Sequence, residues 1–333
     1  MAYTIAFFGS KPYDEASFNE KNSGYGFELR YYKGHLNLNN VILTQGVDAV
    51  CIFVNDTADA EVIRQLAANG VKLLALRCAG YNNVDLKAAA ENGITVVRVP
   101  AYSPYAVAEY TVALMLSLNR KIPRATWRTR DGNFSLHGLL GFDMYGKTAG
   151  IIGTGKIAKK LIALLRGFGM NILAYDLYPD YNFAREHQVV YTTLDELYRS
   201  SDIISLHCPL TEQTRYLIND YSISKMKDGV MIINTGRGQL IHTNALIEGL
   251  KNKKIGSAGL DVYEEESEYF YEDRSDKIID DDTLARLLSF NNVIVTSHQA
   301  FFTREALANI ASTTLMNIKD FMEHKKLENE VRL

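Results

Sequence analysis

The stretch TAGIIGTGKIAKKLIALLRGFG, residues 148–169, decides the fold of this chain. An apolar strand leads into the turn Gly153-x-Gly155-x-x-Ala158, and an amphipathic helix follows the turn. Gly153 permits the tight turn, Gly155 lets the backbone approach a pyrophosphate, and the small Ala158 lets the helix pack closely on the strand. The helix N-terminus also offers N–H groups and a positive dipole to phosphates. Such a turn alone is a weak signal, but a second apolar strand, NILAY at 171–175, follows where a dinucleotide-binding βαβ unit requires it.

Asp176 closes that second strand, 18 residues after Ala158. A carboxylate at this place can accept both ribose hydroxyls of adenosine and would repel a 2′-phosphate. The sequence therefore predicts NAD rather than NADP as the cofactor. The alternative is an ordinary solvated carboxylate at a strand end, and Lys156 and Arg185 are basic residues that could approach the same region.

Outward from this unit, short apolar runs alternate with stretches of helical period along most of the chain. Runs that are apolar on both faces indicate buried parallel strands joined by crossover helices, so the fold class is α/β with doubly wound parallel sheets. The expected helices are 60–68, 85–91, 104–120 and 304–325. The helix 104–120 is a candidate connector between two domains. The other expected strands are 4–8, 49–53, 72–76, 95–99, 149–153, 202–206, 230–234, 256–262 and 292–296.

Composition limits the function classes. The chain has 333 residues, 36 basic and 39 acidic, so its net charge of -3 gives no footprint for nucleic acid or an anionic membrane. No apolar run reaches the roughly 18 residues of a membrane helix, and MAYTIAFFGS has the pattern of a first strand rather than of a signal peptide. Cys51, Cys78 and Cys208 are an odd number and widely spaced, which favours a reducing cytoplasm over disulfides or a metal site.

Polar residues follow several of the predicted strands. In an open parallel sheet the ligand crevice lies at the carboxyl ends of the strands, so these residues are expected on one rim. They are His207, Arg237, Asp261, Glu266 and His298.

Three residues of this rim suit proton-coupled hydride transfer to a 2-oxo acid. Arg237 could grip the substrate carboxylate through its fork of donors, and His298 could protonate the carbonyl oxygen. Glu266 would orient the imidazole and favour its protonated form. Spacing alone leaves alternatives open, because His207 is a rival acid, Arg237 could contact cofactor instead, and Glu266 lies in an acidic run typical of a solvated face.

Five ordered motifs resemble the D-isomer-specific 2-hydroxyacid dehydrogenases over essentially the full length of the chain. These motifs are GTGKIA (153–158), SLHCPLT (205–211), NTGRG (234–238), GLDVYEEE (259–266) and SHQAF (297–301). Within that family, the segments most similar to D-lactate dehydrogenases are LRCAGYNNVD (76–85), VPAYSPYAVAE (99–109) and DVYEEESEYFYEDRSDKIIDDD (261–282).

The resemblance implies a catalytic set of Arg237, Glu266 and His298, with His298 as the proton donor; the family glutamate follows Asp261 by five residues. It implies that substrate carboxylate meets backbone N–H groups of Ala79 and Gly80, with the pocket walled by Phe53, Tyr102 and Phe301. The implied cofactor contacts are Gly153, Thr154, Gly155, Lys156, Ile157, Asp176, Cys208, Pro209, Thr214, Thr235, Gly236 and Asp261.

The resemblance also implies a domain order that composition does not suggest. Residues 1–101 and 300–333 would form a substrate domain, and residues 102–299 an inserted NAD-binding domain, with crossings near Tyr102 and Phe301 acting as hinges. It further implies a homodimer formed through the NAD-binding domain and the helix after Pro104.

The resulting expectation is an NAD-dependent D-lactate dehydrogenase that reduces pyruvate with NADH in the cytoplasm during fermentation. Related lactate enzymes often carry Tyr where this chain has Phe53, which leaves a D-2-hydroxyacid dehydrogenase for larger acids such as 2-oxoisocaproate as the alternative. A non-catalytic NAD-sensing scaffold is a rival from another class, because fold alone does not settle function.

Overall fold

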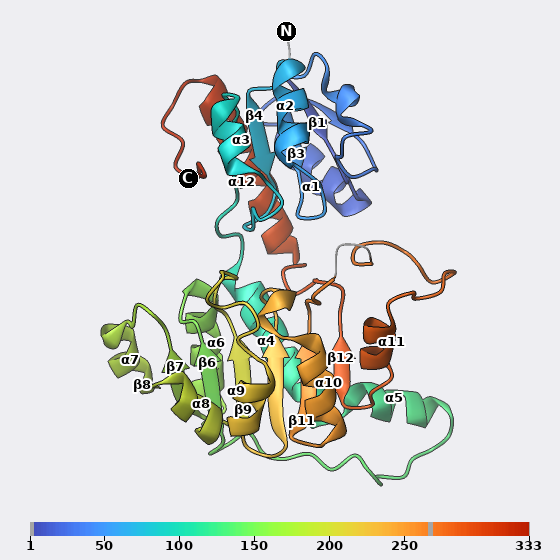
Figure 1. The fold of residues 1–333 in the computed structure, drawn as a ribbon, viewed down its shortest axis with the longest axis vertical. Helices are drawn as coiled ribbons and strands as arrows, with labels where there is room; N and C mark the ends of the chain where they lie inside the picture. The colour runs from blue at the N-terminus through green and yellow to red at the C-terminus, as the bar shows by residue number, and fades with distance from the viewer. Residues whose placement is uncertain (1–2, 266–268, 333) are drawn as a thin grey trace. The chain divides into compact units, whose positions relative to one another are not determined.

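The computed structural model describes residues 3–265 and 269–332 of the chain. Its internal contacts divide the chain into two compact units, a smaller one of Met1–Ser103 with Phe302–Leu333 and a larger one of Pro104–Phe301. In Figure 1 the smaller unit is made up of the first part of the chain, coloured blue to teal, and of its red end, and the part between them makes up the larger unit. The chain thus leaves the smaller unit once, builds the larger one, and returns.

The smaller unit is a parallel sheet in the order β2-β1-β3-β4-β5 with helices around it. Strands β1, β3 and β4 are buried along their whole length, as their continuous apolar sequences predict. Side-chain caps begin α2 and α3, where Asp59 and Asp85 accept backbone N–H groups of the first turn. The elements of this unit are β1 (Thr4–Phe7), α1 (Pro12–Asn22), β2 (Glu28–Tyr31), η1 (Val41–Thr44), β3 (Ala49–Ile52), α2 (Ala60–Ala68), β4 (Leu73–Leu76), α3 (Leu86–Glu91), β5 (Thr95–Val97) and α12 (Arg304–Met322).

The larger unit is a seven-stranded parallel sheet in the order β12-β11-β10-β9-β6-β7-β8. Its elements before the glycine turn are α4 (Pro104–Asn119), α5 (Ile122–Arg130) and β6 (Thr148–Ile152). Those after the turn are α6 (Lys156–Gly167), β7 (Asn171–Tyr175), α7 (Tyr181–His187), β8 (Val189–Tyr191), α8 (Leu194–Ser200), β9 (Ile203–Leu206), α9 (Asp220–Lys225), β10 (Val230–Asn234), η2 (Gly238–Leu240), α10 (Thr243–Lys251), β11 (Ile255–Leu260), α11 (Asp282–Leu288) and β12 (Val293–Val295).

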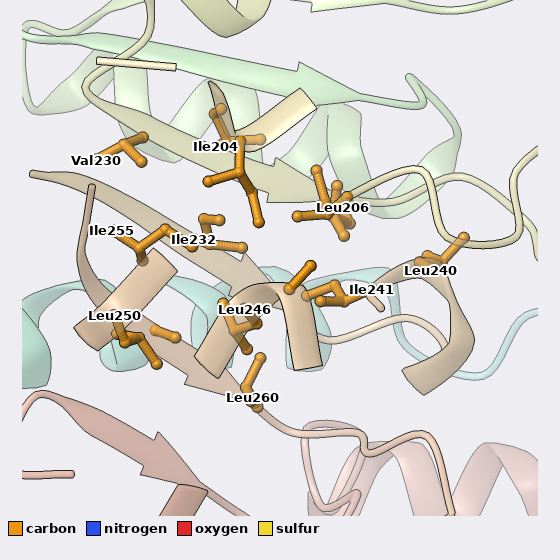
Figure 2. Packing of buried hydrophobic residues seen from close by; sticks show 14 of the residues in the cluster. Ile204, Leu206, Val230, Ile232, Leu240, Ile241, Leu246, Leu250, Ile255 and Leu260 are labelled. Atoms are coloured by element: carbon orange, nitrogen blue, oxygen red, sulfur yellow. The ribbon is translucent and has the colours of Figure 1, made fainter. Parts of the chain in front are cut away.

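Strand β10 shows why the central strands of this sheet are apolar throughout. Its residues alternate between two cores, since Val230 and Ile232 join the cluster that includes α10, while Met231 and Ile233 join the cluster of α4 and α6. Figure 2 shows the first of these, with Ile204, Leu206, Ile232, Leu246 and Leu260 packed between strands β9 to β11 and helix α10. Both faces of the sheet are therefore covered.

The order of the strands fixes where a ligand can bind. From β6 the chain runs outward through β7 and β8, then returns to β9 on the other side of β6 and continues outward to β12. Ligands of open α/β sheets bind at the carboxyl ends of the strands where this direction reverses. The switch point of the larger unit lies between β6 and β9.

The predicted fold class is confirmed, since both sheets are parallel and flanked by helices. The predicted strands are all present, with ends that differ by up to two residues. Helix α4 belongs to the larger unit from its first residue, where it packs on α6, β10 and β11. No helix among residues 3–265 and 269–332 is long and apolar enough to cross a membrane.

Candidate active site

The glycine turn lies at the switch point, pressed against the segment that follows β9. Gly153 has a φ of +89°, and a Cβ built on it would lie 2.6 Å from the backbone nitrogen of Cys208. Gly155, by contrast, has no atom within 4 Å of the position of a Cβ, and it is the N-cap residue directly before α6. Ala158 is fully buried against the sheet. Gly153 thus closes the turn, and Gly155 leaves its backbone accessible to a phosphate group, so these residues fit a dinucleotide.

Asp176 is held at the end of β7 by the glycine turn itself. Its carboxylate accepts the backbone N–H of Thr154 at 2.5 Å, the Thr154 hydroxyl at 2.9 Å and the Tyr178 N–H at 2.8 Å. Burial alone would raise the pKa of Asp176, but the hydrogen bonds from Tyr178 and Thr154 outweigh it and lower the pKa. The side chain is therefore a fixed anion beside the turn, as a ribose-binding group requires.

Other predicted cofactor contacts line the same edge of the sheet. Cys208 and Pro209 follow β9, and the Thr214 hydroxyl donates to the Pro209 carbonyl at 2.7 Å, which closes that loop. Lys156 is exposed and Ile157 half-buried in the first turn of α6. The Arg185 guanidinium donates to Asn182 at 3.2 Å on the exposed α7.

The loop after β10 carries Thr235, Gly236 and Arg237. The Thr235 hydroxyl lies 3.1 Å from that of Thr111 in α4, and the Gly236 N–H donates to Asn234 at 3.0 Å. Asn234 also donates to the carbonyl of Arg237 at 2.9 Å, so one side chain fixes both ends of this short loop. The Arg237 guanidinium is half-buried and donates to the Gly236 carbonyl at 2.8 Å through Nη1.

Gly238 brings the Arg237 loop against the segment that follows β11. A Cβ built on Gly238 would lie 1.9 Å from the carbonyl oxygen of Tyr263 and 2.6 Å from the nitrogen of Glu264. Only a residue without a side chain allows this approach of two backbones. Close packing therefore explains why a glycine follows Arg237. At this glycine the segment after β10 contacts the segment after β11.

Asp261 and His298 join the ends of β11 and β12. The Asp261 carbonyl accepts the His298 N–H at 2.7 Å. The Asp261 carboxylate accepts the Thr296 hydroxyl at 2.7 Å and the N–H groups of Gln299 and Ala300 at 2.9 and 2.8 Å. Burial raises the pKa of Asp261, although these hydrogen bonds partly offset it. The resemblance implies a cofactor contact at Asp261, and in the structure its carboxylate binds the loop that bears His298.

His298 occupies an unusual backbone conformation at the start of that loop. Its φ is 53°, in the left-handed region that non-glycine residues seldom adopt. The Tyr271 hydroxyl donates to the His298 carbonyl at 3.1 Å, and the two rings lie 5.9 Å apart between centroids. Conformations of this kind persist where surrounding contacts hold them, and they cluster at functional sites.

The rival histidine, His207, has the wrong electrostatics for an acid. Burial lowers the pKa of its imidazole to about 4, and its Nε2 lies 2.8 Å from the Ser205 hydroxyl. An imidazole whose pKa is lowered holds little of its protonated form near pH 7, which makes it a poor proton donor to a carbonyl oxygen. His298 is therefore the better candidate of the two.

The acidic run after β11 has members with different surroundings. Glu264 accepts the Thr243 hydroxyl at 2.8 Å and is hydrogen-bonded by the Tyr216 hydroxyl, so this member is structural rather than a solvated charge. Glu265 is exposed. Glu266, the predicted partner of His298, and Glu268 lie outside the described residues.

The residues predicted to bind substrate belong mainly to the smaller unit. Ala79 and Gly80 lie in the loop after β4. The Ala79 carbonyl accepts a hydrogen bond from the Arg98 guanidinium at 2.8 Å, and the Gly80 carbonyl accepts one from the Cys78 thiol at 3.2 Å. Phe53 follows the neighbouring strand β3. The Tyr102 carbonyl accepts the Asn309 amide at 2.7 Å within the same unit, whereas Phe301 is the last residue of the larger unit and is buried.

Two residues of the smaller unit were missed by the sequence analysis. Arg77 directly follows β4, and the rule that identified the other strand-end residues applies to it equally. Asp56 accepts the Phe53 N–H and the Leu36 N–H at 2.6 Å each, a role that no local pattern signals. Within 3–265 and 269–332, no group of three or more His, Cys, Asp or Glu side chains is arranged to hold a metal ion.

Comparisons with known proteins identify relatives along the whole chain. Residues 112–300 match the family model of the D-isomer-specific 2-hydroxyacid dehydrogenase NAD-binding domain. The chain is 51% identical to the D-lactate dehydrogenase of Escherichia coli strain K12 over 327 residues, which cover 98% of this chain and 99% of that protein.

Solved structures have the same fold. The structure of the pyruvate reductase of Chlamydomonas reinhardtii matches with a TM-score of 0.92 at 43% identity, covering 98% of both chains. A D-2-hydroxyisocaproate dehydrogenase structure matches with a TM-score of 0.86 at 31% identity, covering 98% of this chain and 99% of that one.

Proposed function

Because this chain belongs to the D-isomer-specific 2-hydroxyacid dehydrogenase family, we propose that it is an NAD-dependent D-lactate dehydrogenase that reduces pyruvate to D-lactate. The observation that carries the proposal is the meeting of the loops after β10, β11 and β12. Gly238 packs against Tyr263, and Asp261 binds the loop of His298, so the segments that bear Arg237 and His298 are fixed to a common neighbour.

The proposed cofactor is NAD, held on the edge that carries the glycine turn. Gly155 leaves the start of α6 accessible to the pyrophosphate, and the anionic Asp176 would accept the adenosine ribose hydroxyls and disfavour a 2′-phosphate. NADH, when bound, supplies the hydride that reduces the substrate carbonyl carbon.

The protein then supplies the proton and the orientation. We assign His298 as the group that donates a proton to the carbonyl oxygen, and Glu266 as the carboxylate that orients the imidazole. Arg237 would donate hydrogen bonds to the substrate carboxylate and carbonyl. In the oxidation direction, the same imidazole takes the proton back.

The smaller unit is the proposed substrate domain, and the larger unit the NAD-binding domain. Among the described residues, the backbone N–H groups of Ala79 and Gly80 donate to no protein acceptor, which suits them to a substrate carboxylate. Phe53, Tyr102 and Phe301 are the proposed walls. Bulky walls favour pyruvate over larger acids, since extra side-chain volume has to be accommodated.

We propose a homodimer formed through the larger unit. The segment from α5 to β6 exposes large apolar side chains, with exposed fractions of 65% for Trp127, 76% for Phe134, 81% for Leu136 and 88% for Leu140. A second copy of the chain would remove this patch from water. Light scattering after size-exclusion chromatography tests this, because Leu136→Ser with Leu140→Ser should shift a dimer toward monomer.

The reaction is proposed to take place in the cytoplasm. No disulfide joins the three cysteines, of which Cys51 and Cys78 are buried and Cys208 is half-buried. This suits a reducing compartment. A fractionation experiment that recovers the activity outside the cytosolic fraction would contradict it.

The decisive test is NADH oxidation, measured by absorbance, with pyruvate, 2-oxoisocaproate and phenylpyruvate, followed by determination of the product's handedness. We expect the highest kcat/KM for pyruvate and D-lactate as the product. If 2-oxoisocaproate were preferred, the chain would be a D-2-hydroxyacid dehydrogenase for larger acids. Tight NADH binding without turnover of any 2-oxo acid would instead favour a non-catalytic scaffold.

A further inference from the structure

We propose that Arg77 is a positioning residue for the substrate pocket. Its guanidinium holds the ring of Phe53 in place, and this sets the preference for pyruvate over larger 2-oxo acids. This inference deepens the proposed function and rests on it. The role of Arg77 would be to keep one wall of the pocket in place.

The first support is the place of the Arg77 guanidinium in the smaller unit. The side chain is only 3% exposed and lies between two aromatic rings, 4.5 Å from the centroid of Phe7 and 4.9 Å from that of Phe53. A planar guanidinium stacks on aromatic faces and is always charged. Phe7 belongs to the buried core and Phe53 to the proposed pocket, so Arg77 links the pocket wall to the core.

The second support is the way Arg77 connects the loops after the strands. Its Nη2 donates to the Gly9 carbonyl at 2.9 Å and lies 3.6 Å from the carboxylate of Asp14 in α1. Its backbone N–H donates to the Ile52 carbonyl at 3.0 Å, directly before Phe53. One residue thus joins the carboxyl-end loops of β1, β3 and β4.

The third support is that the backbone of Phe53 is fixed by other groups, while its ring packs on the core of the smaller unit and faces the Arg77 guanidinium. Asp56 accepts the Phe53 N–H at 2.6 Å, and the Asn83 amide donates to the Phe53 carbonyl at 2.9 Å. These bonds hold the main chain of residue 53 whatever stands at position 77. Loss of Arg77 should therefore change the position of the ring more than that of the backbone.

The fourth support is the chemical cost of this arrangement. Arg77 Nη1 is buried and has no hydrogen-bond partner in the described parts of the chain, and Asp14 is 6% exposed. A buried ion pair with an unsatisfied donor is seldom more stable than an apolar replacement of equal volume. The pair is therefore better explained by the geometry that it imposes than by stability.

The test compares wild type with Arg77→Met and with the double variant Asp14→Asn/Arg77→Met. Met has a similar length and no charge, and the double variant avoids leaving the Asp14 carboxylate buried without its cation. Asp14→Asn alone keeps Arg77 and serves as the matched control. Leu73→Ala, a fully buried residue at the other end of β4, controls for a general loss of stability.

We expect kcat/KM for pyruvate to fall in both Met variants, mainly through KM. The ratio of kcat/KM for pyruvate to that for 2-oxoisocaproate should shrink by about tenfold, because a ring that can move aside makes room for a larger side chain. The dissociation constant of NADH should stay at the wild-type value. Arg77→Lys should restore the ratio only in part, since an ammonium lacks the plane that stacks on the ring.

The outcomes separate the two proposals. An unchanged ratio in a folded double variant that binds NADH normally would overturn the role of Arg77 while leaving the proposed function intact. An equal change of the kcat/KM ratio in Leu73→Ala would also overturn the role of Arg77, because a general destabilisation of the smaller unit would then be enough to change the substrate preference. A wild-type enzyme that binds NADH but reduces no 2-oxo acid would overturn both.

Discussion

The carbonyl oxygen of Asp261 accepts the backbone N–H of His298 at 2.7 Å, while the Asp261 carboxylate binds three groups of the loop around that histidine. The bonds fix His298 with a φ of 53°, a conformation that its own residue type disfavours. The buried acid at the end of β11 therefore determines where the proposed proton donor lies.

Asp261→Asn should weaken this arrangement without changing its volume. An amide retains one acceptor oxygen and places an NH₂ group where the carboxylate met a backbone N–H, so we expect a loss of about 1–3 kcal/mol in the free energy of unfolding. The kcat of the variant should also fall, because the loop that bears His298 would be held less firmly. Denaturant unfolding and steady-state kinetics measure both, and wild-type values for the two would contradict the anchoring role.

His298→Gln should keep NADH binding but lower kcat by about 10²–10⁴-fold, the usual contribution of a positioned acid–base group. Gln preserves hydrogen bonding and removes the transferable proton. Single-turnover kinetics with fluorescence titration of NADH separate the chemical step from binding. Turnover at the wild-type rate would move the proton transfer to another group.

His207→Gln should change the pH dependence of stability rather than the catalytic step. The pKa of His207 is about 4 in the folded protein, below its ordinary 6.5, so between these values the unfolded chain binds a proton that the folded protein does not. The contribution of His207 to the free energy of unfolding is fully present above pH 6.5. It falls by about 1.4 kcal/mol per pH unit as the pH drops toward 4. Urea unfolding from pH 4 to 7.5 should show a shallower slope in the variant. Equal slopes would mean that the histidine is not held neutral.

Gly155→Ala should separate cofactor binding from folding. No atom lies within 4 Å of its Cβ position, so the free energy of unfolding should barely change, whereas the added methyl group would stand where the pyrophosphate approaches. We expect weaker NADH binding by at least an order of magnitude. Gly167→Ala, at the other end of α6 and equally open, is the matched control and should bind NADH normally.

Asp176→Ala should weaken NADH binding and narrow its advantage over NADPH. The carboxylate is ionised throughout the neutral range because its hydrogen bonds lower its pKa, so its repulsion of a 2′-phosphate operates at every pH of an ordinary assay. The ratio of the two dissociation constants is the measurement. If the preference for NADH persisted, another group would be reading the ribose.

Local patterns were sufficient for the elements with a clear apolar pattern, either continuous or of helical period. Strands such as β10 are apolar on both faces, and α2 and α12 have clear amphipathic periods, so their existence could be predicted. Short elements were missed, including β2, whose burial alternates between exposed and half-buried, and the helices α7 to α9. Such elements depend on neighbours that are distant in the sequence.

The sequence by itself determined the α/β class, the glycine turn and the candidate residues at the strand ends, because period, glycine spacing and strand polarity are local properties of the chain. Only the tertiary structure decided what those residues contact. It showed that Asp261 binds the His298 loop, that burial lowers the pKa of His207, and that Gly238 packs on the Tyr263 backbone. It also placed Arg77 between Phe7 and Phe53. Hydrogen bonds, desolvation and close packing between residues far apart in the chain arise when the sheets assemble, and no local pattern records them.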